Sequence, residues 1–237
     1  MSDPWLEIDC GPNVLALQTI CHPEPGPYGS FNLGLHVGDG VGSVVTNRAR
    51  LAQRFGRKVY FPEQVHGIEV ICVDHESPVI TADAAVTDQL HCPIGIITAD
   101  CLPVLFASQD LIGVAHAGWR GLVAGVLERT LQEFPNPAKV RVWLGPCIGR
   151  DAFEVGPEVV DAFVSKNADW GRYFKSVNDS DRSMADLQGI ACDVLENLSV
   201  VAITRFNACT YSDSKRWYSF RRSGVTGRMA SCIMRTE

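Results

Sequence analysis

Apolar runs of strand length recur from one end of the chain to the other. They predict strands at 14–20, 59–61, 69–73, 84–87, 95–106, 111–116, 140–144, 201–206, 217–220 and 228–234. Apolar positions spaced three and four apart predict helices at 43–55, 122–134, 158–166 and 187–198. Ser43 is expected to cap the first helix and Gly56 to end it, while Pro157 suits the first turn of the third.

The order of these elements bears on the fold class. Strands outnumber helices and do not alternate with them strictly, which favours an α+β fold over a doubly wound parallel sheet. No repeat, low-complexity linker or long charged tract divides the chain, so residues 1–237 are expected to form a single domain with mixed sheets.

Composition narrows the choice of partners. With 46% hydrophobic and 20% charged residues, the chain has the composition of a soluble globular protein. Its net charge of -6 argues against general binding to nucleic acid or to an anionic membrane. The segment from Val201 to Glu237, however, contains seven basic residues and only two acidic ones. A solvated basic face is the ordinary explanation for this excess, and the lining of an anion pocket is the alternative.

Targeting patterns and cysteines indicate a cytoplasmic protein. The N-terminus lacks a basic region followed by an apolar one, and no apolar run approaches the ~20 residues that a membrane span needs. The nine cysteines are scattered, without a CxxC pair. This is typical of a reduced protein in which most thiols are small core residues.

A thiol and an imidazole interrupt the two most apolar strands. If 95–106 and 111–116 pair through a turn on Ser108-Gln109, Cys101 lies directly opposite His116. A register shifted by two residues leaves them diagonal neighbours on one face, whereas a shift of one separates them onto opposite faces. Taken alone, a Cys beside a His is as often a packed core pair as a functional one.

The surroundings of this pair favour a functional site. Asp100 stands where a buried strand should have an apolar residue, and a glycine-rich turn follows His116 and leads into the 122–134 helix. Free N–H groups at that helix start, with Arg120 nearby, would lower the pKa of a thiol and attract an anion.

A Cys and a His form either a nucleophile–base pair or two thirds of a zinc site. His66 is the candidate third ligand, because it ends a short apolar segment in PEQVHG and precedes Gly67, where the backbone can turn sharply.

Nine motifs carry a resemblance to a known family. In order along the chain they are PYGSFNLGLHVGD, NRARLA, QVHG, ADAAVTD, TADCLPVLF, AHAGWRG, LGPCIG, FEVG and TGRMA. Together they resemble the polyphenol oxidase or laccase-domain (YfiH-like) family, also described as purine nucleoside phosphorylases.

The resemblance implies a fold and a metal site. Carried over residue by residue, its zinc ligands are His66, Cys101 and His116. The implied fold is a layered α/β/β/α sandwich with mixed sheets, related to bacterial toxin deamidases that use a Cys–His pair. The implied activities are phosphorolysis of adenosine, inosine, guanosine and methylthioadenosine, with adenosine deamination, and a further role in editing peptidoglycan precursors.

Residue counts separate these activities in part. Multicopper chemistry needs several coppers held largely by histidines, and six histidines without a His-x-His pair make a copper-dependent oxidase improbable. Two His and one Cys form a zinc-type set with an open fourth position, and copper is the alternative metal.

The proton and phosphate chemistry leaves several residues as candidates. Zinc deaminases of the cytidine type use H-x-E and P-C-x-x-C, and both patterns are incomplete here. Another acid would have to move the proton, and the candidates are Asp100 and Asp83. The expected catalytic residues are Asp100, Cys101 and His116. For phosphorolysis, Arg48, Arg120 and a basic group of the C-terminal segment are candidates to bind phosphate and the nucleoside.

Three hypotheses therefore stand. The first is a zinc-dependent nucleoside phosphorylase and deaminase that takes purine nucleosides and phosphate. The second is a metal-free Cys–His hydrolase acting on an amide of a cell-wall precursor. The third is a non-catalytic partner of cell-wall or division proteins; the polar site argues against it, and no particular protein partner is indicated.

Overall fold

The computed structural model describes residues 3–21, 24–178 and 180–237. Its strands are β1 (Trp5–Ile8), β2 (Val14–Thr19), β3 (Val70–Cys72), β4 (Ala84–Thr87), β5 (Ile94–Thr98), β6 (Leu102–Ala107), β7 (Ile112–Ala117), β8 (Arg141–Leu144), β9 (Glu154–Val155), β10 (Phe174–Ser176), β11 (Ser183–Ala185), β12 (Ala202–Arg205) and β13 (Met229–Arg235). Its helices are α1 (Val41–Phe55), α2 (Trp119–Ala124), α3 (Val126–Gln132), α4 (Pro157–Lys166), α5 (Leu187–Asn197) and α6 (Phe220–Ser223), with short 3-10 helices at Pro137–Lys139 and Ala168–Tyr173.

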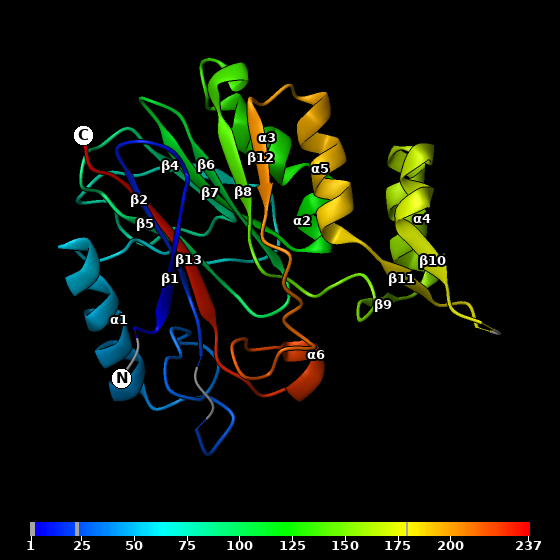
Figure 1. The fold of residues 1–237 in the computed structure, drawn as a ribbon, viewed down its shortest axis with the longest axis horizontal. Coiled ribbons are helices and arrows are strands. Elements are labelled where there is room, and N and C mark those ends of the chain that lie inside the picture. The colour runs from blue at the N-terminus through cyan, green and yellow to red at the C-terminus, as the bar shows by residue number, and fades with distance from the viewer. Residues whose placement is uncertain (1–2, 22–23, 179) are drawn as a thin grey trace.

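Two sheets form the centre of the molecule. One has the antiparallel order β1-β2-β13-β5, and the other has the mixed order β12-β8-β6-β7-β4-β3 (Figure 1). The two sheets bury an apolar layer between them, including Ile96 and Ile233 from the first and Leu105 and Val114 from the second. Full burial of such side chains contributes roughly 1.5–3 kcal/mol each.

Helices cover the outer face of each sheet. On the four-stranded sheet, Leu51 of α1 packs in one cluster with Leu17 and Cys232. On the six-stranded sheet, Phe106 packs in another cluster with residues of α3 and α5. The layers are therefore α/β/β/α, and the expected α+β fold with mixed sheets is confirmed. Helix α4 and the small sheet β10-β11-β9 lie at one side of the molecule (right in Figure 1).

The predicted strand 95–106 is wrong in one respect that matters for the site. It is two strands, because β5 belongs to the four-stranded sheet and β6 to the six-stranded one. The chain crosses between the sheets at 99–101, where Asp100 has a φ of 88°. Because both flanking strands are buried and apolar, the polar Asp100 between them was not sufficient to reveal the crossing.

The predicted register of the β6–β7 hairpin is also corrected. Ser108 and Leu111 close the turn through mutual hydrogen bonds, which leaves Gln109 and Asp110 at its tip. His116 consequently pairs with Pro103 and not with Cys101. This is the register shifted by two residues, which keeps Cys101 and His116 on the same side.

Of the other predicted strands, seven are confirmed and two are wrong. Segments 14–20, 69–73, 84–87, 111–116, 140–144, 201–206 and 228–234 all contain strands close to the expected bounds. Segment 59–61 makes only an isolated bridge between Tyr60 and Ile94, and 217–220 is not a strand. The apolar pattern at 217–220 reflects core packing and not strand pairing, since Trp217 and Tyr218 pack in one buried cluster with Met229.

The helices show two differences from the expected pattern. Gly40, and not Ser43, is the N-cap of α1, while Gly56 ends it in the left-handed conformation as predicted. The predicted helix 122–134 is divided into α2 and α3 at Gly125, whose φ of 104° breaks the helical path. The other two predicted helices correspond to α4, with Pro157 in its first turn, and α5.

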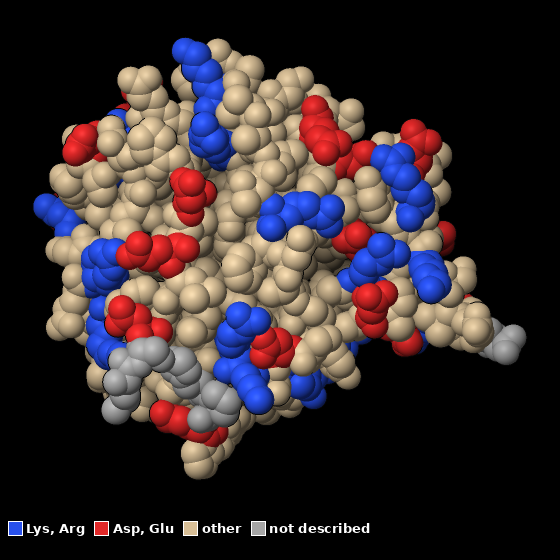
Figure 2. All heavy atoms as spheres, viewed as in Figure 1, with Lys and Arg blue, Asp and Glu red and all other residues tan. Residues whose placement is uncertain are grey.

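No helix among the described ranges is long and apolar enough to cross a membrane. On the face shown in Figure 2, the basic and acidic side chains of the described residues are interspersed.

Candidate metal centre

Three side chains from separate segments converge at the crossing between the sheets. His66 precedes β3, Cys101 immediately precedes β6, and His116 lies within β7. Their ligand atoms all lie within 4.8 Å of one another. His66 Nε2 is 3.8 Å from Cys101 Sγ, and the two imidazole rings meet edge to face with centroids 4.7 Å apart.

This donor set suits zinc. Ligand atoms of a tetrahedral zinc site, about 2.0–2.3 Å from the ion, lie roughly 3.3–3.8 Å from one another. Two imidazole nitrogens and one thiolate already lie close to that spacing. Three protein ligands leave a fourth position for another group, as in catalytic zinc sites.

The carboxylate of Asp83 orients one of the ligands directly. Asp83 is fully buried, and its Oδ1 accepts a hydrogen bond of 2.7 Å from His116 Nδ1. With Nδ1 occupied in this way, Nε2 of His116 is the nitrogen left for a metal. A carboxylate behind a metal-binding histidine is the usual supporting arrangement, and it raises the basicity of the imidazole.

Asp83 also holds the loop that carries His66. Its carboxylate accepts hydrogen bonds from the backbone N–H groups of Val65, His66 and Gly67 at 3.1, 2.9 and 2.6 Å. His66 has a φ of 63°, in the left-handed region that few residues adopt, and these bonds stabilise it there. Asp83 was expected only as a possible proton carrier; the sequence feature that marks it is an acid immediately before the apolar strand β4.

The thiol and the second imidazole form a charged pair. Burial raises the pKa of Cys101, but the charge of His116 and hydrogen bonds from both histidines outweigh it and lower that pKa to about 6. Burial lowers the pKa of His116, but the Cys101 thiolate and Asp83 outweigh it and raise that pKa to about 9. At neutral pH the metal-free site therefore holds a thiolate, which is the form that binds metal.

Two glycines of the AHAGWRG motif keep space for the site. A Cβ on Gly118 would lie 3.1 Å from both Cys101 Sγ and His66 Cδ2. A Cβ on Gly121 would lie 2.9 Å from the carbonyl oxygen of Gly67, closer than real contacts allow. The start of α2 can therefore approach the ligand set only because both positions lack side chains.

Asp100 is buried and fully engaged on the far side of the Cys101 backbone. Its carboxylate accepts hydrogen bonds from Thr210 Oγ1 at 2.6 Å, Ser219 Oγ at 3.0 Å and the N–H of Arg221 at 2.7 Å. Asp100 is not among the residues that line the cavity beside the metal ligands.

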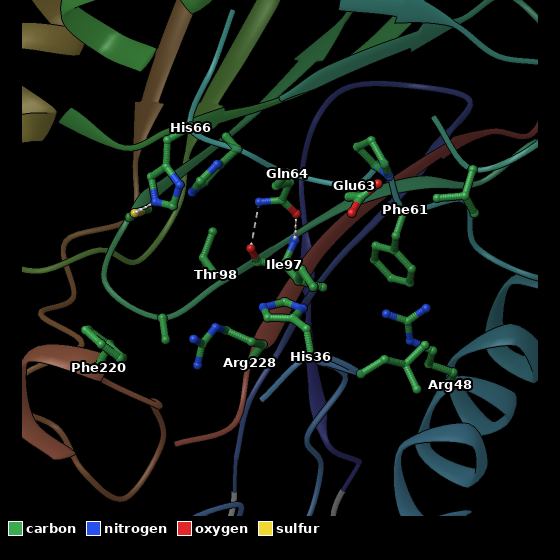
Figure 3. A pocket seen from close by; sticks show the side chains of 16 residues that line it. His36, Arg48, Phe61, Glu63, Gln64, His66, Ile97, Thr98, Phe220 and Arg228 are labelled. Carbon is green, nitrogen blue, oxygen red and sulfur yellow. Dashed lines mark hydrogen bonds between the residues drawn. The ribbon is translucent and has the colours of Figure 1, made fainter. Parts of the chain in front are cut away.

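That cavity has a volume of about 550 Å³ (Figure 3). It is lined by Leu35, His36, Arg48, Phe61, Pro62, Glu63, Gln64, His66, Val79, Ile97, Thr98, Ala99, Cys101, His116, Phe220 and Arg228. The three candidate ligands therefore open onto a space of the size that holds a small molecule.

Two arginines give the cavity a positive wall. Arg48 donates to the carbonyl oxygen of Leu33, and Arg228 donates to the carbonyls of Thr226 and Gly227. Within the described part of the chain neither guanidinium has a carboxylate partner.

The structure brings only some of the expected anion-binding groups together. Arg48 and a basic residue of the C-terminal segment, Arg228, both line the cavity. Arg120 instead is exposed over the ring of Trp119 and does not line the cavity. Arg228 lies in the TGRMA motif, but the sequence offered it as a phosphate ligand only as one of seven basic residues of the C-terminal segment.

Three further groups in the cavity were not expected. Thr98 is buried, and among the described residues its hydroxyl has no hydrogen-bond partner. His36 lies beside the arginines, and burial together with the charges of Arg228 and Arg48 lowers its pKa, so it is neutral at pH 7. Phe220, at the start of α6, is 57% exposed.

Comparison with known proteins places these features in context. Residues 22–236 match the family model described as multi-copper polyphenol oxidoreductase laccase. The chain is 44% identical over 210 residues to a purine nucleoside phosphorylase of Pseudomonas aeruginosa, covering 87% of this chain and 86% of that protein. It is 42% identical over 213 residues to the purine nucleoside phosphorylase YfiH of Escherichia coli, covering 87% of each.

Solved structures show the same fold. A Neisseria meningitidis protein superposes with a TM-score of 0.94 at 36% identity, covering 99% of this chain and 100% of that chain. YlmD from Geobacillus stearothermophilus superposes with a TM-score of 0.84 at 29% identity, covering 100% of this chain and 98% of that chain.

Proposed function

Because the chain belongs to the multi-copper polyphenol oxidoreductase laccase family, and its relatives above are named purine nucleoside phosphorylases, we propose that it is a zinc-dependent purine nucleoside phosphorylase. The observation that carries the proposal is one cavity that joins a His–Cys–His set to two arginines, neither of which has a carboxylate partner among the described residues. Expected substrates are adenosine, inosine, guanosine and methylthioadenosine, together with phosphate.

The arginines supply the phosphate site. In phosphorolysis a phosphate oxygen forms a bond to the anomeric carbon of ribose, and the glycosidic bond breaks with its electron pair leaving on the purine. Arg48 and Arg228 would hold the phosphate beside that carbon, since a charge-assisted hydrogen bond contributes roughly 1.5–3 kcal/mol. Neutral His36 can donate or accept a further hydrogen bond without adding charge.

The nucleoside would occupy the rest of the cavity. The hydroxyl of Thr98 has no hydrogen-bond partner in the described ranges, and it offers a hydrogen bond to a ribose hydroxyl or a purine nitrogen, because a buried hydroxyl without a partner is costly. The exposed ring of Phe220 offers a face on which a purine can stack.

His66, Cys101 and His116 would hold the zinc, with Asp83 fixing the two histidines. Zinc bound there supplies Lewis acidity next to the substrate. The single cluster of three metal-ligating groups found in the described ranges supports a mononuclear site over a multicopper one, and copper remains a competitor for the same ligands.

Adenosine deamination is proposed as a second activity of the same cavity. Asp100 and Asp83 already accept three and four hydrogen bonds within the described structure, so they are poorly placed to carry a proton. Glu63 is the acid among the residues described as lining the cavity, and Thr81 donates to it. We therefore assign the proton transfer to Glu63, and Glu63→Gln should reduce deamination more than phosphorolysis.

One observation favours a second candidate function. Without metal, the thiolate of Cys101 beside His116 resembles the nucleophile–base pair of cysteine hydrolases, which could cleave an amide of a cell-wall precursor. Bound zinc would mask that thiolate. The metal content of the purified protein therefore distinguishes the two functions.

The decisive experiment follows adenosine with and without phosphate in protein of known zinc content. The expected products are adenine and ribose 1-phosphate, formed only when phosphate is present. Ribose formed at the same rate without phosphate would make the protein a hydrolase. Inactivity toward nucleosides with zinc bound would redirect attention to the amide substrate, and inactivity toward both would favour a binding role.

Nine free thiols in the chain support a cytoplasmic site of action.

A further inference from the structure

A second pair of cysteines lies close to the metal-ligand loop but outside the cavity just described. Cys147 follows β8 and Cys209 follows β12, and the two residues form an isolated parallel β-bridge. The N–H of Thr210 donates to the carbonyl oxygen of Cys147 at 2.9 Å. Residues paired across neighbouring strands lie about 5 Å apart at Cα, within the roughly 4.4–6.8 Å that a disulfide requires. Both cysteines line a separate cavity of about 340 Å³.

The two sulfur atoms differ in their surroundings. Cys209 is partly exposed, and its Sγ accepts hydrogen bonds from the N–H of Gly149 at 3.2 Å and from Ser212 Oγ at 3.3 Å. Burial raises the pKa of Cys209, but these bonds outweigh it, and the net effect lowers that pKa. Cys147 is buried, its Sγ donates to the carbonyl oxygen of Ile148, and burial raises its pKa. The thiol of Cys209 is therefore the more reactive one, and the protonated thiol of Cys147 lies beside it.

We propose that Cys209 is a site of oxidation by hydroperoxides and that Cys147 resolves the product to a Cys147–Cys209 disulfide. In the first step the Cys209 thiolate forms a bond to a peroxide oxygen and the O–O bond breaks. This leaves a sulfenic acid on Cys209 and releases hydroxide, or an alkoxide from an organic peroxide. In the second step the Cys147 sulfur attacks the Cys209 sulfur, and the hydroxyl leaves with the Cys147 proton as water. The two thiols thus supply the two electrons that reduce one peroxide, and a thiol reductant restores both.

Hydrogen bonds connect this pair to the metal-ligand loop. Thr210 Oγ1 donates to Asp100 Oδ1 at 2.6 Å, and the N–H of Ile148 donates to the Asp100 carbonyl oxygen at 2.9 Å. Both neighbours of the cysteine pair therefore hold the residue immediately before Cys101. A Cys147–Cys209 disulfide would lock these two anchors together, and with them the position of Asp100 next to Cys101. This consequence rests on the proposed function, whereas the oxidation itself does not.

Titration of the zinc-loaded, full-length protein with hydrogen peroxide tests the proposal. After the remaining thiols are alkylated, peptide mass spectrometry should find one Cys147–Cys209 cross-link, reversed by dithiothreitol. In Cys147→Ser protein the reaction should stop at a sulfenic acid, with dimedone labelling of Cys209 about tenfold above that of Cys72. Cys72 is the internal control, because it is exposed and its pKa is raised by burial and by nearby carboxylates.

Two variants serve as controls. Cys101→Ala separates the oxidation from the metal assignment, and Cys209→Ser removes the reactive thiol by a change that the fold should tolerate. Cys101→Ala protein should form the same cross-link at an unchanged rate, so failure of the proposed function leaves this result standing. Cys209→Ser, a change at a partly exposed position, should abolish the cross-link. Dimedone labelling of Cys209 no greater than that of Cys72, or a cross-link between other cysteines, would overturn the proposal.

Discussion

The buried imidazole of His116 and the buried carboxylate of Asp83 share a hydrogen bond of 2.7 Å between Nδ1 and Oδ1. The same carboxylate accepts three backbone N–H groups from the loop of His66. One acid thus fixes two of the three candidate ligands.

Asp83→Asn should therefore weaken zinc binding about 10–100-fold, as loss of a supporting carboxylate usually does. The amide nitrogen of Asn cannot accept hydrogen bonds, so part of the loop 65–67 loses its anchor as well. Competition with a chromogenic chelator measures the affinity. Asp161→Asn, at an exposed position of α4, is the control and should bind zinc as the unmodified protein does.

Purified protein should contain one zinc per chain. Ala at His66, Cys101 or His116 should lower that content to a small fraction, because each removes one of three ligands. Cys147→Ala should leave it intact, since Cys147 lies outside the ligand set. Equal loss from Cys147→Ala and Cys101→Ala in elemental analysis would show that the thiolate ligand is misassigned.

Metal-free protein should show an unusual pH dependence of thiol alkylation. The pKa of Cys101 is lowered to about 6, so its thiolate appears as the pH rises through 6 and is nearly complete at pH 7. The rate of iodoacetamide labelling at Cys101 should follow that curve, whereas exposed Cys72, whose pKa is raised, should react only at alkaline pH. Added zinc should suppress the labelling of Cys101 alone. A Cys101 profile that coincides with that of Cys72 would contradict the charged pair.

The same pair predicts how stability depends on pH. The lowered pKa of Cys101 stabilises the fold above pH 9 and loses its effect as the pH falls toward 6. The raised pKa of His116 stabilises the fold below about pH 6.5 and loses its effect as the pH rises toward 9. Between these limits the folded and unfolded chains bind the same number of protons at the pair, so its contribution to the free energy of unfolding should be flat. Denaturation of metal-free protein at pH 7 and pH 8.5, compared with that of Cys101→Ala, measures this.

Arg48→Ala and Arg228→Ala should each raise the KM for phosphate about tenfold, because each removes a charged hydrogen-bond donor from the cavity. Zinc content should not change. Arg120→Ala is the informative comparison, since Arg120 is exposed over Trp119. If Arg120→Ala raised that KM as much as Arg48→Ala, phosphate would bind at the start of α2 instead.

Gly118→Ala should lower zinc affinity without unfolding the protein. Its methyl group would lie 3.1 Å from both Cys101 Sγ and His66 Cδ2, so those two side chains must each move away from residue 118 by a few tenths of an ångström. Gly42→Ala makes the same chemical change in α1, where a Cβ meets nothing within 4 Å. That control should retain zinc and gain slightly in stability. Equal zinc affinity in both variants would rule out the crowding argument.

That Cys101 and His116 lie together could be predicted from the sequence for the expected register and for one shifted by two residues, and the reason is the period of a strand. The predicted register was wrong by two residues, yet a shift of two keeps both side chains on one face. Apolar runs also predicted most strands, because burial on both faces leaves little else in those positions.

Other features depended on contacts that no local pattern records. The crossing between sheets at 99–101 falls between two buried apolar strands, and Asp100 alone did not show that the chain changes sheet there. Arg228 reaches the cavity and Arg120 does not, although both are simply basic residues near glycines. Asp83 acts through residues 65–67, which precede it by more than fifteen positions and meet it only in the folded chain.

The three candidate ligands come from a loop, from the passage between two sheets and from strand β7. An unfolded chain cannot present them together, so zinc can bind strongly only after both sheets have assembled. Zinc at a hundred times its Kd then adds about 2.7 kcal/mol to the free energy of unfolding. The amount of folded protein in a cell should accordingly follow the zinc supply, and chelation should shorten its lifetime against proteolysis even when no substrate is present.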